Sequence, residues 1–290
     1  MLVVLAGCSG AGAPPDRPAV APPATTATTA ATGAPPTAPR EPIPRSPARL
    51  AARHAEVVDR LRADIDAWLR TRPAPSATPP ARIELEALWQ QRVYRHLARH
   101  PALARAAIAR LPPRLRPEAR DSVAALRSLF RLTSHATEVR FRAGPPAPPG
   151  LLRRFYREAQ RRFSVRWDVL AGINMIESNF GRLRNVSNAG AVGPMQFLPA
   201  TWRRYGMGGN IRDPHDAILG AANYLHASGA PASYSRAVFA YNPSRLYVAA
   251  VLRFARRIRR DRLAFYAYWS WQSWRRTRSG EQQLTGPGAG

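Results

Sequence analysis

Apolar residues recur at helical spacing along most of the chain after residue 49, and this periodicity limits the possible folds more than any other feature. Residues 50–69, 83–111 and 117–132 each place apolar side chains on one face of a helix, with arginines between them. Residues 151–274 continue as helical segments punctuated by Gly, Pro or Asn, without the sustained alternation that strands show. The sequence therefore predicts a mainly α protein.

Proline clusters and shifts in composition divide the chain into segments. Residues 9–48 consist mainly of Ala, Pro, Thr and Gly, and so few large apolar side chains cannot offset the entropy lost on folding. A proline cluster at 145–149 marks the start of the main domain. We expect the following segments: a disordered tether at 9–48, a helical accessory region at 49–143, the main helical domain at 150–262, an aromatic terminal helix at 263–276 and a disordered tail at 277–290.

The single cysteine, Cys8, follows an apolar stretch at residues 2–7. One cysteine excludes an intrachain disulfide. The stretch resembles a bacterial lipobox, in which the cysteine becomes diacylated after export, so we expect lipidation at Cys8 and an extracytoplasmic location, either membrane-anchored or in the cell wall. The alternative is a small free cysteine in a disordered terminus.

The formal net charge is +26, and all the basic residues are arginines, since the sequence contains no lysine. Such an excess points to a polyanionic partner, whereas arginine together with many Ala, Pro and Gly residues is also what a GC-rich genome produces. Both interpretations stay open. We expect no nucleic-acid partner, because the arginines are spread widely and no DNA- or RNA-binding motif is recognisable.

One glutamate, Glu177, lies at the edge of an apolar helix face. The periodicity predicts a helix over 165–180 that ends at Gly181. Its apolar face is formed by Val169, Ile173, Ile176 and Phe180. Partial burial at that edge is expected to raise the pKa of Glu177 toward about 6–7, which suits a general acid. The alternative is a solvated glutamate or one paired with an arginine.

Glu177 belongs to a set of three motifs. Glu177-Ser178 at the helix end is followed by residues 188–202, NAGAVGPMQFLPATW, and later by Ala240-Tyr241-Asn242. This ordered set resembles the catalytic domain of the lytic transglycosylases, within the SLT and lysozyme-like superfamily. Residues 213–218 and 221–225 make it most similar to the membrane-bound lytic transglycosylase B type. The resemblance covers about residues 150–262 and implies a lysozyme-like helical catalytic domain.

The resemblance also implies roles for five residues. Glu177 would be the acid that protonates the bridging oxygen between N-acetylmuramic acid and N-acetylglucosamine. The substrate-binding residues would be Ser178, Gln196, Tyr241 and Asn242. Gln196 is expected on a helix opened by Gly193-Pro194. The expected substrate is the peptidoglycan glycan strand, cleaved by a monomer without cofactor, with anionic cell-wall polymers as further candidate partners.

The number of carboxylates separates a transglycosylase from an ordinary hydrolase. A two-carboxylate glycosidase needs a second acid about 5–9.5 Å from the first. The other acids of the catalytic region are Glu158, Asp168, Asp213, Asp216 and Asp261. None is an obvious partner: Asp168 points to the opposite side of the same helix, and Asp213 and Asp216 have the spacing of an N-cap. One acid suffices if the C6 hydroxyl of muramic acid attacks and forms a 1,6-anhydro ring, as the resemblance implies. A lysozyme-type hydrolase and a catalytically silent binding module are the alternatives.

Two remaining sequence features are interpreted as structural and not as catalytic or metal-binding. His96 and His100 stand four residues apart as metal ligands do, but no third ligand is evident, so we expect a solvated face and no metal. The aromatic run at 265–274 can stack on sugars, but a run this dense more often packs a terminal helix onto the body. The region at 49–143 either presents arginines to anionic polymers or braces the main domain.

Overall fold

The computed structural model describes residues 37–132, 141–277 and 280–289. Within these ranges the chain forms eleven helices and one two-stranded hairpin, which confirms the mainly α fold. The helices are α1 (Pro47–Arg70), α2 (Ala81–Arg99), α3 (Pro101–Arg110), α4 (Arg116–Leu132), α5 (Pro149–Phe163), α6 (Trp167–Ser178), α7 (Pro199–Tyr205), α8 (Pro214–Ala227), α9 (Tyr234–Tyr241), α10 (Arg245–Arg260) and α11 (Arg262–Trp269). The strands are β1 (Trp274–Thr277) and β2 (Gly280–Gln283).

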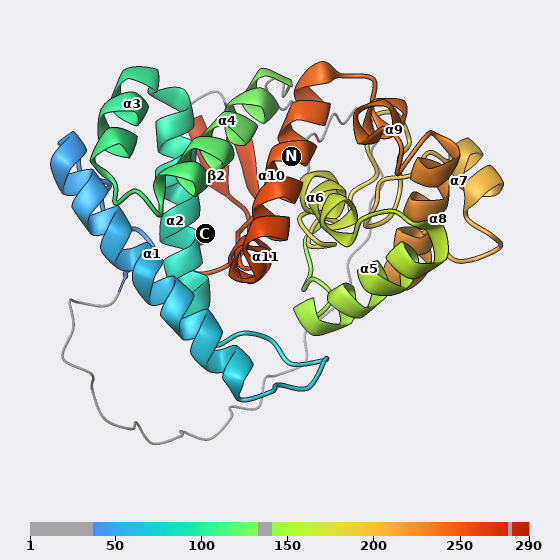
Figure 1. The fold of residues 1–290 in the computed structure, drawn as a ribbon, viewed down its shortest axis with the longest axis horizontal. Coiled ribbons are helices and arrows are strands. Elements are labelled where there is room, and N and C mark those ends of the chain that lie inside the picture. Colours follow the sequence, from blue (N-terminus) through green and yellow to red (C-terminus); the bar gives the residue numbers. More distant parts are fainter. Residues whose placement is uncertain (1–36, 133–140, 278–279, 290) are drawn as a thin grey trace, which may run out of the picture.

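The helices form two groups that meet at α10. Figure 1 shows α1–α4 on one side of the molecule and α5, α7, α8 and α9 on the other. Between them, α10 packs against α4 on one side and against α6 on the other. The helix α6, which carries Glu177, therefore lies at the centre of the molecule, where partner side chains can reach it from both groups.

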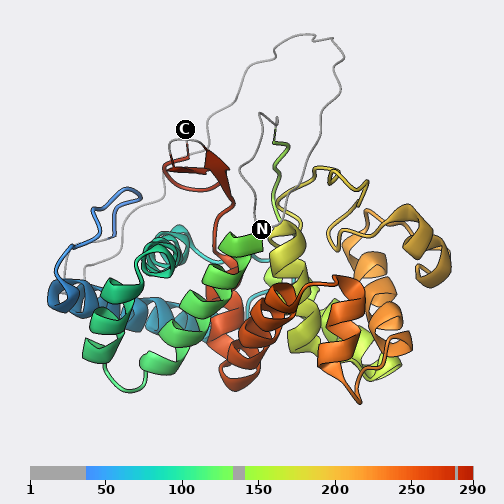
Figure 2. The same ribbon diagram turned by 90° about the horizontal axis from the view of Figure 1, so that it is seen from above.

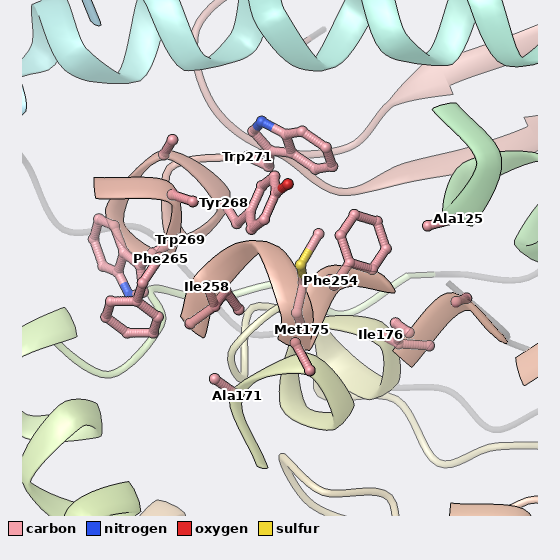
Figure 3. Close-up of a cluster of buried hydrophobic side chains, with 14 of the residues drawn as sticks. Ala125, Ala171, Met175, Ile176, Phe254, Ile258, Phe265, Tyr268, Trp269 and Trp271 are labelled. Carbon is pink, nitrogen blue, oxygen red and sulfur yellow. The ribbon is translucent and has the colours of Figure 1, made fainter. Parts of the chain in front are cut away.

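A continuous set of buried side chains joins the two groups. Figure 3 shows Met175 of α6 and Phe254 of α10 beside Tyr268 of α11 and Trp271, which follows α11. Tyr268 and Trp271 are almost completely buried there, so the aromatic run packs the C-terminal segment onto the body. The region before residue 143 thus shares one core with the main domain and braces it.

One expected helix is divided in two. The single helix expected over 83–111 is wrong: α2 ends at Arg99 and α3 begins at Pro101. His100, between them, has φ −119° and ψ 80°, outside the helical region. Proline has no N–H to donate, and its ring excludes the helical conformation at the preceding residue, so the chain turns at this point.

Two described segments that were expected to be disordered, residues 37–48 and 280–289, form defined contacts. In the expected tether, Thr37 is buried and Glu41 forms an ion pair with Arg53, while Cys8 lies outside the described residues. In place of a helix to residue 276 and a disordered tail, β1 pairs antiparallel with β2, beside α2 (Figure 2). Glutamine side chains hold this segment: Gln91 Nε2 donates to the Gln272 carbonyl (2.8 Å), and Gln283 Nε2 donates to the Thr285 carbonyl (2.8 Å). The periodicity of apolar residues in the sequence cannot predict hydrogen bonds of this kind.

Among the described residues, no helix combines the length and the apolar character that a membrane span requires.

Candidate active site

The C-terminus of α6 positions Glu177. The helix ends at Ser178, and the next three residues, Asn179 (φ 52°), Phe180 (φ 61°) and Gly181 (φ 87°), take the left-handed conformation. A positive φ is unusual for residues that carry a side chain, such as Asn179 and Phe180. Asn179 is held in it because its Nδ2 donates to the Trp271 carbonyl at 2.9 Å. The buried C-terminal segment therefore fixes the end of the helix that carries the candidate acid.

Glu177 is half-buried, and its Oε1 accepts a hydrogen bond from the Tyr247 hydroxyl at 2.5 Å. Burial raises the pKa of Glu177 to about 7, although the Tyr247 hydrogen bond opposes that rise. This agrees with the pKa of about 6–7 expected from its position at the edge of the core. Glu177 forms no ion pair with an arginine in the described part of the chain. The group can therefore hold and release a proton near neutral pH.

Two tyrosines, the buried Tyr247 and the partly buried Tyr241, line the site beside Glu177. Tyr241, at the end of α9, donates its hydroxyl to the Met195 carbonyl at 2.6 Å. Burial raises the pKa of Tyr241 and of Tyr247 well above the usual value, and the charge of Glu177 raises both further. Both phenols therefore remain protonated at neutral pH. The charge of Glu177 acts on Tyr241, so the two side chains lie near each other.

The sequence interpretation missed Tyr247. Its partner in α6 is 70 residues away in the sequence. One signal could have identified it: the buried face of α10 is formed by Tyr247, Ala250, Val251 and Phe254. A hydroxyl on such a face must find a hydrogen-bond partner, and Glu177 is that partner.

Gln196 lies in a tight turn, and the expected helix opened by Gly193-Pro194 is wrong. Val192 and Phe197 pair across the turn, and Gln196 has φ 50°. The next helix, α7, begins only at Pro199. Gly193 has φ +80°, and a Cβ there would lie 1.9 Å from the Ile211 carbonyl oxygen, so glycine is required.

The turn also orients the Gln196 side chain. Its Nε2 donates to the Gly193 carbonyl at 2.9 Å and to the Asn185 carbonyl at 3.3 Å. Its Oε1 accepts no hydrogen bond from the described residues. The half-buried side chain thus offers a carbonyl acceptor to a hydroxyl of a bound sugar.

Ser178 is fully buried and cannot touch a substrate, which corrects its expected substrate-binding role. Its Oγ donates to the Pro194 carbonyl at 2.6 Å and accepts from the Gly181 N–H at 2.8 Å. Asn174 Nδ2 donates to the same Pro194 carbonyl at 2.8 Å. Ser178 and Asn174 are therefore positioning residues that tie α6 to the turn carrying Gln196. The role of Asn174 was not foreseen from the sequence.

Asn242 follows α9, where its N–H donates to the Val238 carbonyl at 3.1 Å. The residue is half-buried, and its side chain forms no hydrogen bond with the described residues. It directly follows Tyr241 and precedes α10, so the loop between α9 and α10 brings Asn242 and the two tyrosines together. Its amide group can serve as a donor and an acceptor for substrate.

The other carboxylates of the catalytic region each have a different partner. Asp168 is buried, pairs with Arg166, and lies about 13 Å along α6 from Glu177. The side chain of Asp213 accepts from the His215 and Asp216 N–H groups, which confirms the expected N-cap. Glu158 Oε2 contacts His215 Nε2 at 3.0 Å, Asp216 Oδ2 accepts from the Asn210 N–H, and Asp261 caps α11. None of these contacts is with Glu177.

Asp213, His215 and Asp216 are the one group among the described residues whose ligand atoms lie close enough together to hold a metal ion, all within 4.8 Å. Asp213 accepts from backbone N–H groups at the start of α8, and Asp216 accepts from the Asn210 N–H in the loop before it. Asp213 thus caps the helix, and Asp216 holds the preceding loop. The ring centres of His96, on α2, and His100, which follows it, lie 4.2 Å apart outside this group.

Residues 154–257 match the family model described as the transglycosylase SLT domain. The matched segment runs from α5 into α10 and contains Glu177, Gln196, Tyr241 and Tyr247. It covers less than half of the chain and supports the lytic transglycosylase superfamily for this segment. No curated protein and no solved structure matches the chain.

Proposed function

We propose that this protein is a peptidoglycan lytic transglycosylase that cleaves the β-1,4 bond from N-acetylmuramic acid to N-acetylglucosamine and leaves a 1,6-anhydromuramoyl product. The observation that carries this proposal is the half-buried Glu177, whose pKa is about 7 and whose carboxyl group is held by Tyr247. The segment around it matches the transglycosylase SLT domain. An acid of this kind can donate a proton at neutral pH and take it back within one reaction.

In the first half of the proposed reaction, protonated Glu177 gives its proton to the glycosidic oxygen. The bond between that oxygen and C1 of muramic acid breaks, and N-acetylglucosamine leaves with a hydroxyl group. In the second half, the C6 hydroxyl of the same muramic acid attacks C1, and ionised Glu177 accepts its proton. One C–O bond breaks and one forms, no water is consumed, and Glu177 ends in its starting state.

The neighbouring side chains support this cycle in different ways. The Tyr247 hydroxyl bonds to Oε1, which orients the carboxyl group and leaves Oε2 for the substrate. That hydrogen bond also stabilises the ionised form, so the pKa does not rise beyond the range in which the group can cycle. Gln196 and Asn242 offer amide groups to sugar hydroxyls. Tyr241 holds the turn before Gln196 through the Met195 carbonyl.

The experiment that tests the proposal is mass spectrometry of the soluble products from purified peptidoglycan. Wild-type protein should release muropeptides that end in 1,6-anhydromuramic acid, one water lighter than hydrolysis products. Glu177→Gln keeps the size of the side chain and should release none, while Glu158→Gln, changed at a carboxylate that contacts His215, should retain activity. Reducing-end products would indicate a hydrolase, and wall binding without products would indicate a binding module.

We also propose that the protein is exported and anchored through a lipid on Cys8, and that it is nearest to the membrane-bound lytic transglycosylase B type. The lipobox-like sequence before Cys8 supports the anchor, and residues 213–218 and 221–225 support the type. Cys8→Ser should move the protein from the membrane fraction to the soluble fraction. An unchanged distribution would contradict the anchor.

A further inference from the structure

A groove beside the end of α6 is lined by three arginines and otherwise by Gly, Ala, Pro, Val, Leu and Phe residues. Arg142 precedes α5, Arg184 follows α6, and Arg212 precedes α8. The groove has a volume of about 520 Å³, within the range of small-molecule sites. We call it the arginine groove.

The arginine groove carries three positive charges and no carboxylate in its described lining. All three arginines are exposed, and none of them forms an ion pair with a residue that the structure describes. An arginine side chain donates hydrogen bonds and accepts none. The lining side chains therefore suit an anion rich in acceptor oxygens, and they offer no acceptor to the hydroxyl groups of a neutral sugar.

Arg142 and Arg184 are neighbours across a short antiparallel pairing. Ala143 and Leu183 form an antiparallel bridge, and the Arg184 N–H donates to the Arg142 carbonyl at 3.0 Å. Residues directly opposite in such a pairing point to the same face, with Cβ atoms about 4.5–5.5 Å apart, and like charges there are destabilising. An anion bound between the two arginines would remove this repulsion.

The backbone before α5 holds the Arg184 side chain in position. Its Nη2 donates to the Pro145 carbonyl at 3.3 Å. Its guanidinium group lies against Gly144, where a Cβ would lie 2.5 Å from the guanidinium carbon. A guanidinium group fixed in this way has less freedom to lose when it binds an anion.

The turn that carries Gln196 forms part of the lining through Gly193 and Pro194. The segment before α8 packs directly against this turn. A Cβ on Gly193 would lie 1.9 Å from the Ile211 carbonyl oxygen and 3.5 Å from the Arg212 Cα. Arg212 is therefore carried by a segment in contact with the turn.

The segments of the other two arginines also reach the turn. Gln196 Nε2 donates to the carbonyl of Asn185, which directly follows Arg184, at 3.3 Å. Asn185 Oδ1 accepts from the Arg142 N–H at 2.8 Å. A ligand that joins the three arginines would thus tie three segments together around the turn.

We propose that the arginine groove binds a phosphate ester with an apolar body, and that the bound phosphate stiffens the turn that carries Gln196. A phosphate monoester has about 1.5 to 2 negative charges at pH 7 and three acceptor oxygens, so it suits three arginines better than one carboxylate does. The Pro, Val, Leu and Phe lining suits the apolar body. A lipid headgroup and a soluble phosphate ester share this chemistry, and the inference does not depend on the proposed cleavage reaction.

Calorimetry with three probes tests the chemistry of the ligand. Dihexanoyl phosphatidic acid, used below the concentration at which it forms micelles, should bind. Inorganic phosphate should bind about tenfold more weakly, because it buries no apolar surface. Dihexanoyl phosphatidylcholine, which has no net charge, should not bind. The inference is overturned if phosphatidic acid does not bind, or if either of the other probes binds as tightly.

Variants of the protein place the binding in the arginine groove. Arg184→Gln and Arg212→Gln should each weaken phosphatidic acid binding about tenfold, the size of one charge-assisted hydrogen bond. Gly144→Ala keeps all three charges but displaces the Arg184 guanidinium group, so it should weaken binding as well. Arg203→Gln, at an exposed arginine of α7 outside the groove, is the matched control and should bind as wild type does.

Equal binding by wild type, Arg184→Gln and Arg212→Gln would overturn the site, and equal weakening in Arg203→Gln would mean general charge attraction. Thermal unfolding shows whether each variant is folded. Because Arg184 and Arg212 are exposed and lie on different segments, one folded variant suffices.

Hydrogen exchange tests the effect on the turn. The Gln196 N–H donates to the Gly193 carbonyl and the Phe197 N–H to the Val192 carbonyl, both at 3.0 Å. If the turn opens only when the ligand has left, phosphatidic acid at ten times Kd should slow exchange of these two amides about tenfold. Unchanged exchange in the ligand-bound protein would overturn the stiffening.

Sedimentation with vesicles of phosphatidylcholine and phosphatidic acid distinguishes the two sources of the ligand. Retention of wild type and of Arg203→Gln, but not of Arg212→Gln, would identify a membrane lipid. Retention that is absent, or equal in all three proteins, would identify a soluble phosphate ester as the source of the binding seen by calorimetry.

Discussion

Replacing Glu177 by glutamine should stabilise the protein above neutral pH, because the site holds a carboxyl group in surroundings that disfavour its charge. The pKa of Glu177 is raised from 4.5 to about 7, mainly by burial. A carboxyl group whose pKa is higher in the folded state binds its proton more tightly when folded. Protonated Glu177 therefore stabilises the folded state fully below pH 4.5. This stabilisation is lost as the pH rises through about 7.

The size of the effect follows from the shift in pKa. One pKa unit corresponds to about 1.4 kcal/mol, so the shift corresponds to roughly 3 kcal/mol, reduced to about 2 kcal/mol because solvent reaches the half-buried group. Glutamine is neutral at every pH and has the same shape. The difference in unfolding free energy between Glu177→Gln and wild type should be near zero at pH 4 and reach about 2 kcal/mol at pH 8.

Urea unfolding of both proteins across pH 4–8 measures this difference directly, and thermal unfolding gives a second reading of roughly 2–4 °C per kcal/mol. Glu158→Gln is the control, because the Glu158 side chain on α5 is 44% exposed, and its difference from wild type should change much less over the same range. A difference for Glu177→Gln that stays flat between pH 4 and 8 would refute the raised pKa. A difference that falls with pH would mean that the charged form is favoured in the folded state.

Three further changes test the positioning of the site. Tyr247→Phe removes the hydrogen bond to the ionised form of Glu177, so the basic limb of the kcat/KM profile should move up by about one pH unit, and an unmoved limb would contradict this role. Ser178→Ala leaves the Gly181 N–H without its partner and the Pro194 carbonyl with Asn174 alone, and should lower unfolding stability by about 1–3 kcal/mol and reduce kcat, whereas full stability would show that the contacts are dispensable. Gly193→Ala puts a Cβ against the Ile211 carbonyl oxygen and strains a backbone with φ +80°, so the turn should shift and kcat/KM should fall more than tenfold, while wild-type kinetics would show that the turn is not needed.

The sequence by itself determined the elements whose causes are local. Helical periodicity gave the mainly α fold and placed Glu177 at the edge of an apolar face, which is why its raised pKa could be expected. The aspartate-proline start of α8 identified the N-cap at Asp213, because capping involves only the next three residues. The motif at 188–202 identified the segment with Gln196, although not its turn.

Only the tertiary structure decided which residues from distant parts of the chain meet. Tyr247 reaches Glu177 from 70 residues away, and Asn179 is held by the carbonyl of Trp271, 92 residues further on. Ser178 was expected to face the substrate, and its burial depends on where the Gly193-Pro194 turn packs against α6. Spacing along one helix fixes which face a side chain occupies, but the group that covers that face is set by the packing of all the helices together. For the same reason, the polar contacts at the C-terminal hairpin are visible only in the folded protein.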